Sequence, residues 1–409
     1  MRINRNLNPR ICLLLFIIFA SCHNRQELTV HQSHAAITGA YPGYNILPAK
    51  PDTAGMSSTA VQLAAKMKIG WNLGNTLEAT GGETAWGNPE VTNALIMAVK
   101  RSGFNAVRIP CAWDQYANQS TGKIKDAWLS RVKQVVQYCI DNNMYVVLNI
   151  HWDGGWLENN CIPEKKDAVN AKQKAYWEQI ATSMRDFDEH LIFASANEPA
   201  VANAAQLDVL LSYHQTFIDA VRSTGGKNTY RTLVVQGPST DFDKTLRMMT
   251  KMPEDKVKNR LMLEVHSYTP YQFALMEKDE KWGNQFYYWG RSYHSSFDTA
   301  HNATWGEESE INRISKAMKA RFVDKGIPVI IGEFGVIRRS SLSGNTLSRH
   351  LNARAYYLKY FVKQTISNGL IPFYWDEGGL GNNSFGIFNR HTNTVFDKQA
   401  LDSLMLGTN

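Results

Sequence analysis

The sequence predicts a single (β/α)8 barrel, and three observations support this. Eight short apolar runs recur along the chain, helical patterns fill the intervals between them, and no linker or repeat interrupts residues 60–406. Continuous apolar runs are typical of parallel strands that are buried on both faces. Eight strands that alternate with helices are typical of such a barrel, whereas a doubly wound sheet would not need eight units.

The predicted strands end in polar or aromatic residues. In chain order they are 69–73, 106–110, 145–151, 191–198, 232–236, 261–266, 328–333 and 371–375. Apolar stripes at helical spacing lie between them, in 89–102, 127–140, 175–187, 207–223, 311–324 and 351–367. Asn88, which precedes Pro89, is the predicted cap of the first helix, and Asp126 is the predicted cap of the second.

The N-terminus has the pattern of a bacterial export signal. Three arginines within residues 1–10 precede an apolar run over 11–20, which is shorter than the roughly 20 residues that cross a bilayer. Phe19-Ala20-Ser21-Cys22 resembles a lipoprotein box, in which the cysteine becomes the lipidated N-terminus. We expect a signal peptide at 1–21 and a lipid anchor on Cys22, which would place a membrane-anchored lipoprotein at the cell surface or in the periplasm. Cleavage nearby without lipidation is the alternative.

The rest of the chain divides into two parts. Residues 22–59 are polar with scattered glycine and proline, which predicts a flexible tether. Residues 60–409 form the predicted catalytic domain, and we expect a monomer.

The net charge of +7 does not indicate a nucleic-acid partner. From Cys22 onward the balance is 41 basic against 37 acidic residues, or +4, because the other three arginines lie in the leader. We find no basic stripe of the kind that binds nucleic acid.

Three cysteines remain after the leader and the anchor: Cys111, Cys139 and Cys161. Cys139 falls on the apolar face of a predicted helix and is expected to be buried. Whether Cys111 and Cys161 pair is left open. No CxxC motif or His/Cys cluster predicts a structural metal.

The active site of such a barrel lies at the carboxyl ends of its strands. The residues at these ends that carry chemistry are Asn75, Arg108, His151, Asn197, Glu198, His266, Tyr268, Glu333 and Trp375. Glu198 ends the fourth strand and Glu333 ends the seventh, so the two face each other across the barrel mouth. Two opposed carboxylates are what glycoside hydrolysis requires.

Five motifs in this order resemble glycoside hydrolase family 5. They are Trp71–Asn75, Arg108–Pro110, Asn197–Pro199, His266–Tyr268 and Gly332–Gly335. The first of them, together with Ala85–Pro89, looks most like subfamily 4, which contains endo-β-1,4-glucanases and xyloglucanases. The resemblance spans nearly the whole domain.

The resemblance implies a retaining, endo-acting glycosidase of β-1,4-linked plant polysaccharides. It would hydrolyse the β-1,4-glucan linkages of cellulose, mixed-linkage glucan or xyloglucan by double displacement and would need no cofactor or metal. Glu198 matches the acid/base and Glu333 the nucleophile of this family. The supporting positions follow: Asn197 matches the contact to the sugar 2-hydroxyl, His151 and His266 match residues that line the catalytic subsite, Trp375 matches the aromatic floor, and Asn75 matches a contact on the glycone side.

Electrostatics predict how neighbours support the two carboxylates. Arg108 is a permanent cation that would orient Glu333 and stabilise its ionised form, and Tyr268 would donate to the same carboxylate. The charge of Glu333 is expected to raise the pKa of Glu198, so that Glu198 is protonated first.

Several alternatives stay open at this stage. Within the family, β-mannan and xylan are the competing substrates; outside it, the competitors are a metal-dependent barrel hydrolase and a non-catalytic glycan-binding lipoprotein. Many relatives carry a second histidine directly after the position of His151, where this chain has Trp152. Six tryptophans are candidates either for outer sugar subsites or for ordinary packing: Trp86, Trp113, Trp152, Trp156, Trp282 and Trp289.

Overall fold

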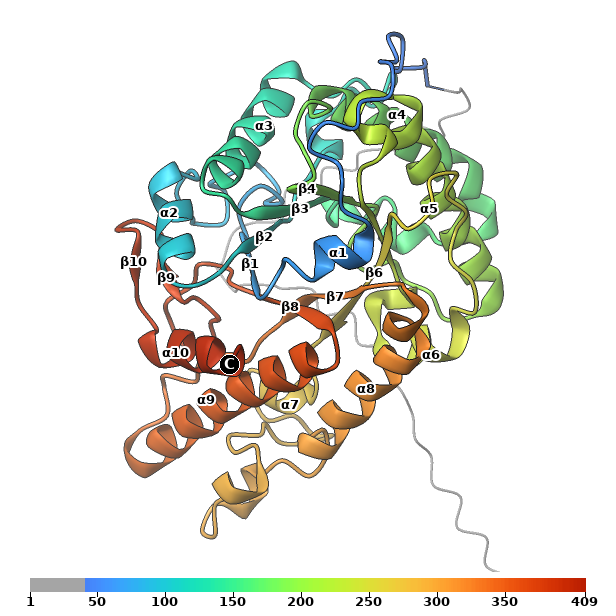
Figure 1. Cartoon of the computed structure of the whole chain (residues 1–409). Helices are drawn as coiled ribbons and strands as arrows, with labels where there is room; N and C mark the ends of the chain where they lie inside the picture. Colours follow the sequence, from blue (N-terminus) through green and yellow to red (C-terminus); the bar gives the residue numbers. More distant parts are fainter. Residues whose placement is uncertain (1–40) are drawn as a thin grey trace, which may run out of the picture. The chain divides into compact units, whose positions relative to one another are not determined.

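The computed structural model describes residues 41–409, whose eight main strands close into a parallel barrel in sequence order (Figure 1). This confirms the predicted fold. The strands are β1 Gly70–Asn72, β2 Ala106–Ile109, β3 Tyr145–Asn149, β4 Leu191–Ala194, β5 Leu233–Gln236, β6 Leu261–Ser267, β7 Val329–Phe334 and β8 Leu370–Tyr374. The predicted signal peptide at 1–21 and the predicted lipid anchor Cys22 lie outside the described residues.

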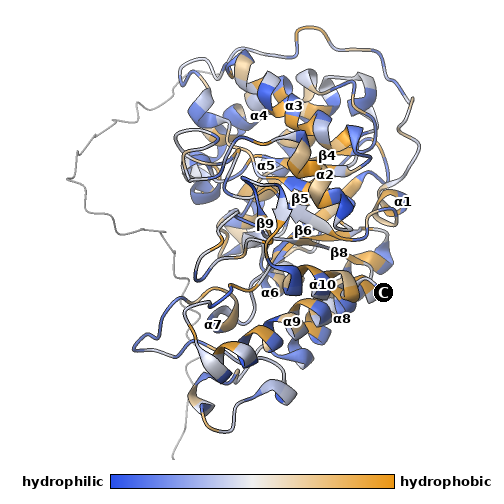
Figure 2. Cartoon of the chain, turned by 90° about the vertical axis from the view of Figure 1, so that its left-hand side faces the viewer, coloured by the Kyte–Doolittle hydropathy of each residue, from blue (hydrophilic) through white to orange (hydrophobic). Residues whose placement is uncertain are grey.

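Helices surround the barrel and close one end of it. They are α1 Ala60–Ala64, α2 Asn93–Arg101, α3 Asp126–Asp141, α4 Lys166–Ser183, α5 Ala204–Ser223, α6 Phe242–Met248, α7 Tyr271–Ala274, α8 Glu308–Arg321, α9 Gly344–Ser367 and α10 Lys398–Gly407. A short hairpin, β9 Phe388–Asn389 with β10 Thr394–Val395, follows β8. In the turned view of Figure 2, α1 and the segment around α7 lie on opposite sides of the barrel.

Two main apolar layers hold these elements together, and a third, smaller cluster lies around the start of α5. The larger layer lies between the strands and the outer helices, and the smaller one fills the barrel interior beneath α1. Ala60 and Leu63 of α1 pack there with residues from the strands such as Val147 and Phe373. The strands are buried on both faces, which explains why they are continuously apolar in sequence.

The first outer helix begins later than predicted. Helix α2 starts at Asn93, and the hydroxyl of Thr92 caps it by accepting from the backbone N–H of Leu95. Asn88 instead uses its side-chain amide to join two loops, donating to the carbonyls of Asn75 and Glu377 at 2.8 Å each. The predicted cap was wrong because an asparagine before a proline is equally suited to bridging loops.

The part of the predicted tether that the structure describes, residues 41–59, lies against the barrel. The backbone N–H of Tyr44 donates to Glu178, and Ala49 forms a parallel bridge with Gly225. Ser58 donates twice to the carboxylate of Glu189, at 2.6 and 2.8 Å. The structure therefore differs from the prediction here, because polar composition alone does not distinguish a solvated segment from one whose polar groups are paired with the domain.

The three described cysteines, Cys111, Cys139 and Cys161, are buried and free. The burial of Cys139 agrees with the prediction, and the open question of a bond between Cys111 and Cys161 is answered by their unpaired thiols. Within residues 41–409, none of the helices combines the length and the apolar character that crossing a bilayer requires.

Candidate active site

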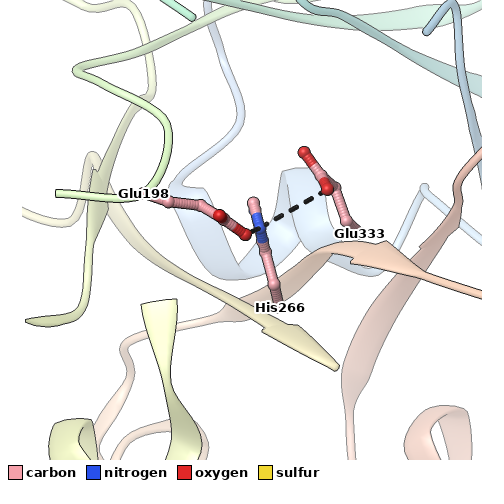
Figure 3. Close-up of side chains that lie close together, drawn as sticks. All are labelled: Glu198, His266 and Glu333. Atoms are coloured by element: carbon pink, nitrogen blue, oxygen red, sulfur yellow. Dashed lines mark hydrogen bonds and ion pairs between the residues drawn. The ribbon is translucent and has the colours of Figure 1, made fainter. Parts of the chain in front are cut away.

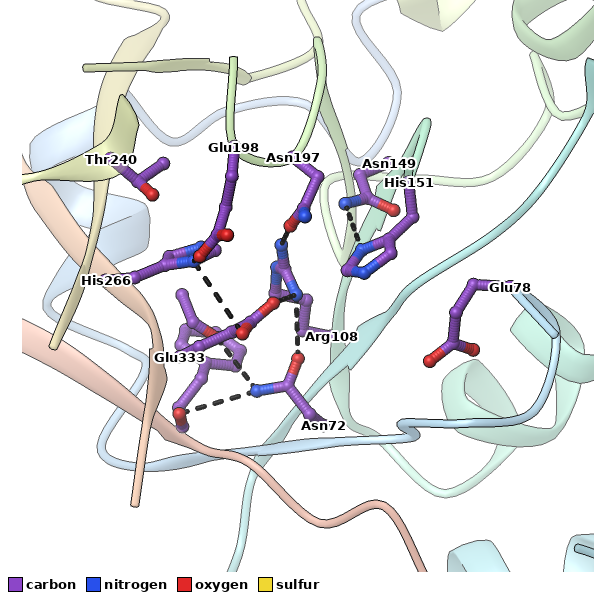
Figure 4. Close-up of polar contacts among 12 residues, drawn as sticks. Asn72, Glu78, Arg108, Asn149, His151, Asn197, Glu198, Thr240, His266 and Glu333 are labelled. Atoms are coloured by element: carbon purple, nitrogen blue, oxygen red, sulfur yellow. Dashed lines mark hydrogen bonds and ion pairs between the residues drawn. The ribbon is translucent and has the colours of Figure 1, made fainter. Parts of the chain in front are cut away.

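Six of the predicted site residues meet at the carboxyl ends of four strands, as Figure 4 shows for most of them. Arg108 comes from β2, Asn197 and Glu198 follow β4, His266 and Tyr268 come from the end of β6, and Glu333 comes from β7. Because the parallel strands all end on one side of the barrel, residues far apart in sequence are brought into direct contact.

Arg108 is the centre of this cluster. Its guanidinium group is fully buried, and its Nε lies 2.8 Å from Oε1 of Glu264. Nη1 donates to Oε1 of Glu333 at 2.9 Å, and Nη2 donates to Oδ1 of Asn197 at 2.8 Å. Burial lowers the pKa of Arg108, but the charges of Glu264 and Glu333 outweigh burial and raise it, so the group is a permanent cation.

Glu333 receives one donor on each carboxylate oxygen. Arg108 donates to Oε1, and the hydroxyl of Tyr268 donates to Oε2 at 2.9 Å. Burial and the charge of Glu333 raise the pKa of Tyr268 well above its ordinary value, so Tyr268 keeps its proton and remains a donor. These are the two contacts to Glu333 that the sequence predicted.

His266 lies between the two carboxylates of Glu198 and Glu333, as Figure 3 shows. Its Nδ1 is 2.6 Å from Oε1 of Glu198 and 3.7 Å from Oε2 of Glu333, and its Nε2 is 3.2 Å from Oε1 of Glu264. Burial lowers the pKa of His266, but the charge of Glu333 and the hydrogen bonds to Glu198 and Glu264 raise it to about 9. Both ring nitrogens face carboxylates, so the ring is an imidazolium that donates in both directions.

The pKa of Glu198 shifts in the direction opposite to the prediction. Desolvation raises it, but the hydrogen bond and the positive charge of His266, with the charge of Arg108, outweigh desolvation and lower it. The prediction was wrong because it considered only desolvation and repulsion by Glu333, and the sequence did not place His266 in contact with Glu198. About half of the Glu198 side chain, 46%, is exposed to the cleft.

Glu198 and Glu333 are close enough for a retaining reaction. One carboxylate oxygen from each and one nitrogen of His266 lie within 4.8 Å of one another. Retaining glycosidases have their two carboxyl groups about 5–5.5 Å apart, and inverting ones about 6.5–9.5 Å.

The same three side chains meet the distance requirement of a metal site. A metal would have to displace the proton from Nδ1 of His266, whose pKa is about 9. At neutral pH the arrangement therefore favours a protonated His266 between the two carboxylates over a bound metal ion.

His151 and Trp375 lie side by side at the edge of this cluster. Their rings stack with centroids 6.1 Å apart and planes 11° apart. Burial, with the charges of Arg108 and His266, lowers the pKa of His151 well below its ordinary value, so the ring is neutral. Asn75 lies in the loop after β1 with a left-handed backbone, φ 54°, and its side chain is partly exposed.

The six candidate tryptophans fall into two groups according to the solvent exposure of their side chains. Trp113 and Trp289 are fully buried and pack in the core, and Trp156 is partly buried beneath the ammonium group of Lys172. Trp86, Trp152 and Trp282 are 40–55% exposed and remain available to a ligand.

Three site residues were missed in the sequence. Glu264 lies two positions before His266 on β6, and Asn72 and Gln236 stand in β1 and β5. Gln236 donates to Glu264 at 2.6 Å, and Asn72 accepts from Arg108 at 3.0 Å. The signal that could have identified them is a polar residue within an apolar strand. Alternate residues of a strand point to the same face, so Glu264 is expected on the face of His266.

The comparisons with known proteins agree on one family. The model of the cellulase family, glycosyl hydrolase family 5, matches residues 72–380. The xyloglucan-specific endo-β-1,4-glucanase of Bacteroides ovatus is 39% identical over 377 residues, which cover 88% of this chain and 72% of that protein. Endoglucanase A of Paenibacillus barcinonensis is 36% identical over 395 residues, which cover 90% of this chain and 95% of the relative.

Solved structures show the same similarity. The Bacteroides ovatus xyloglucanase in complex with a XXXG heptasaccharide aligns with a TM-score of 0.82 at 36% identity, over 91% of this chain and 81% of that one. A broad-specificity GH5-4 endoglucanase from Ruminococcus champanellensis with bound cellotriose aligns with a TM-score of 0.72 at 35% identity, over 85% and 98%.

The raised pKa of His266 predicts a loss of stability in mild alkali. The folded-state pKa of about 9 lies above the ordinary value of 6.5, so this contribution to stability is complete below pH 6.5 and is lost as the pH rises through 9. The expected loss is about 3 kcal/mol in the free energy of unfolding. Urea unfolding followed by circular dichroism between pH 6 and 10 measures it.

His266→Gln is the matched reference, because it keeps a polar side chain that does not titrate. The difference in free energy of unfolding between the two proteins should shrink across this pH range. A difference that stays constant with pH would show that His266 is not charged in the folded chain.

Proposed function

This chain belongs to glycoside hydrolase family 5 and is an endo-acting glycosidase of β-1,4-glucans, and we propose that Glu333 is its nucleophile, Glu198 its acid/base and xyloglucan its preferred polymer. The observation that carries these roles is the pair of carboxylates within 4.8 Å, each with a different set of donors. Glu333 has a donor on both oxygens, whereas Glu198 has His266 on Oε1 alone.

The first step is attack by Glu333 on the anomeric carbon of the sugar. The new bond joins a carboxylate oxygen to that carbon, the glycosidic bond breaks, and the leaving oxygen takes a proton from Glu198. Arg108 and Tyr268 hold the Glu333 carboxylate in one orientation, so no reorganisation is needed during attack.

Glu198 becomes protonated when substrate covers it. In the free protein its side chain is 46% exposed, and the positive charge of His266 keeps its pKa low. A bound sugar removes the remaining water, and this desolvation raises the pKa of the carboxyl group. Because His266 donates to Oε1, the proton is carried by Oε2 and is free to point at the glycosidic oxygen.

In the second step a water molecule attacks the glycosyl-enzyme. Glu198, now a carboxylate, accepts the proton of the water, and the bond to Glu333 breaks with net retention at the anomeric carbon. Asn197 is positioned for the 2-hydroxyl, because Arg108 occupies its Oδ1 and leaves its amide N–H groups to donate. The stacked pair of His151 and Trp375 supplies the apolar wall against the sugar ring.

The preference for xyloglucan rests on the relatives and on the shape of the cleft. The Bacteroides ovatus relative is named as xyloglucan-specific and its structure holds a xyloglucan heptasaccharide. Beside Glu198 the cleft opens into a cavity of about 200 Å³ that Asp241, Thr269 and Glu310 help to line. A branched chain needs room of this kind, and carboxylates accept hydrogen bonds from sugar hydroxyls.

We also propose that the mature protein is a lipoprotein anchored through Cys22. The support is the arginine-rich start, the apolar run of 11–20 and the box that ends at Cys22. The anchor would hold the enzyme at the cell surface or in the periplasm.

Substitution of the two carboxylates should give two different rescue products. Glu333→Ala is expected to lower the rate by about 10⁴-fold or more, because the covalent step is lost. With added azide and an activated aryl β-glycoside it should form the α-glycosyl azide, since one displacement inverts the anomeric carbon. Glu198→Ala should form the β-glycosyl azide, since azide then attacks the glycosyl-enzyme from the other face. NMR of the products distinguishes them, and the same anomer from both variants would contradict the assigned roles.

Polymer specificity is measured by release of reducing ends from xyloglucan, carboxymethyl-cellulose, mixed-linkage glucan, xylan and β-mannan. We expect the highest kcat/KM on xyloglucan and no loss of rate in a chelator. A higher rate on mannan or xylan would assign the alternative substrate, and binding without cleavage would identify a non-catalytic glycan-binding protein. Glu333→Gln is the inactive control, because it keeps the shape of the side chain.

Lipidation is tested by Cys22→Ala in the full chain. The native protein should incorporate labelled fatty acid and sediment with membranes, whereas the variant should be found in the soluble fraction. A variant that still sediments with membranes would show that the anchor lies elsewhere.

A further inference from the structure

A second cavity, of about 370 Å³, lies outside the catalytic cleft. We call it the α9 groove, because its walls are the N-terminal half of α9 and the segment that comprises the 3₁₀ turn Arg291–Tyr293 and the residues up to Phe297. Figure 1 shows this segment, in gold, beside α9, and the ring contact between Tyr293 and Tyr356 joins the two. The α9 groove and the cavity beside Glu198 share no lining residue.

The aromatic side of the α9 groove is open to ligand. Phe297 is 64% exposed, and the guanidinium of Arg349 lies 5.3 Å from the centre of its ring. Tyr293 is fixed by stacking on Tyr356, with centroids 4.9 Å apart and planes 27° apart. Two aromatic rings are therefore held at a concave surface.

The opposite side of the α9 groove carries four polar side chains, two of which have neither a hydrogen-bond partner nor a ring partner in the described part of the chain. Asn345, Ser348, Arg349 and Asn352 line it at positions i, i+3, i+4 and i+7, so they share one face of α9. Among residues 41–409, no hydrogen bond involves the side chains of Asn345 and Ser348, whereas Asn352 accepts from Gln399 at 3.3 Å and Arg349 lies over the ring of Phe297. The amide of Asn345 and the hydroxyl of Ser348 are thus available to bind a ligand.

This combination matches a sugar chain. A pyranose ring has an apolar C–H face that stacks on aromatic rings, and its rim of hydroxyl groups needs both donors and acceptors. The α9 groove offers Phe297 and Tyr293 for the face, and Asn345 and Ser348 for the rim. It has no acidic side chain and a single cation, Arg349, that is already held over an aromatic ring, which favours a neutral glycan over a charged one.

We propose that the α9 groove is a second binding site for the same neutral β-glucan chain that the catalytic cleft cleaves, an inference that rests on the proposed function. Helix α9 begins shortly after β7, the strand that carries Glu333, so its N-terminal half lies at the same end of the barrel as the cleft. A long polymer can occupy both sites at once, and the second contact then becomes intramolecular and raises the affinity of the pair.

Polymer binding in the Glu333→Gln chain tests the proposal without hydrolysis. Affinity electrophoresis in gels that contain xyloglucan gives the dissociation constant. Removal of the ring in Phe297→Ala, or of the cation in Arg349→Ala, is expected to weaken retention by about three- to tenfold, the effect of losing one stacked sugar contact. Phe297→Tyr keeps a ring and should retain binding.

Phe396→Ala is the matched control. Its ring is 43% exposed and also lies beneath a guanidinium, that of Arg338, at 5.5 Å, but it does not line the α9 groove. Retention by this variant should equal that of the parent. If Phe297→Ala is retained as strongly as the parent, the proposal is wrong.

Hydrolysis by the otherwise native chain provides the second measurement. Phe297→Ala should lower kcat/KM on the polymer by a similar factor and leave kcat/KM on a short chromogenic cellotrioside unchanged, because that substrate cannot span both sites. An equal loss on the short substrate would overturn the proposal, since it would show an effect on the cleft or the fold.

Failure of the proposed function gives a different result. If the native chain cleaves no β-glucan but retention still depends on Phe297, the α9 groove stands as a glycan site and the proposed function fails. If the chain cleaves the polymer and retention is independent of Phe297, the proposed function stands and the α9 groove does not bind glucan.

Discussion

The buried ion pair between Arg108 and Glu264 is the interaction on which the rest of the site depends. Both side chains are fully buried, and either charge alone inside the barrel would cost several kcal/mol. The amide of Gln236 on the second oxygen of Glu264 completes the solvation of that carboxylate. Close packing protects the pair, because a Cβ atom at Gly332 would collide with the Glu264 carboxylate.

The Arg108–Glu264 pair provides both Glu333 and Glu198 with a positively charged neighbour. Arg108 uses one remaining nitrogen for Glu333, and Glu264 holds His266 in its protonated form beside Glu198. In the proposed double displacement, one negative charge moves from Glu333 to Glu198 and the total charge does not change. His266 lies 2.6 Å from Glu198 and 3.7 Å from Glu333, so a single fixed cation stabilises whichever of the two is charged.

Position along the strands made most of the site predictable. Glu198 and Glu333 were identified because each stands where an apolar run ends, and Arg108 because a cation inside an apolar strand needs a partner. Glu264 carries the same signal, but its importance depends on the closure of the barrel that brings Arg108 of β2 within 2.8 Å of it, which is a tertiary property. The predicted direction of the pKa shift of Glu198 was wrong for the same reason. A pKa depends on contacts with neighbouring groups, and the spacing of residues along the sequence does not reveal those contacts.

The conformation of the loop after His151 also depends on a buried charge, the carboxylate of Asp153. Trp152 and Asp153 have left-handed backbones, with φ 35° and 52°, and such conformations cost about 1–3 kcal/mol each for residues with side chains. The Asp153 carboxylate accepts from the backbone N–H groups of Trp113, Asp114 and Gln115, which offsets that cost and fixes the turn. Trp152, which stands where many relatives have a second histidine, is consequently 40% exposed next to the stacked pair of His151 and Trp375. The departure from the family pattern thus exposes an aromatic ring directly after His151.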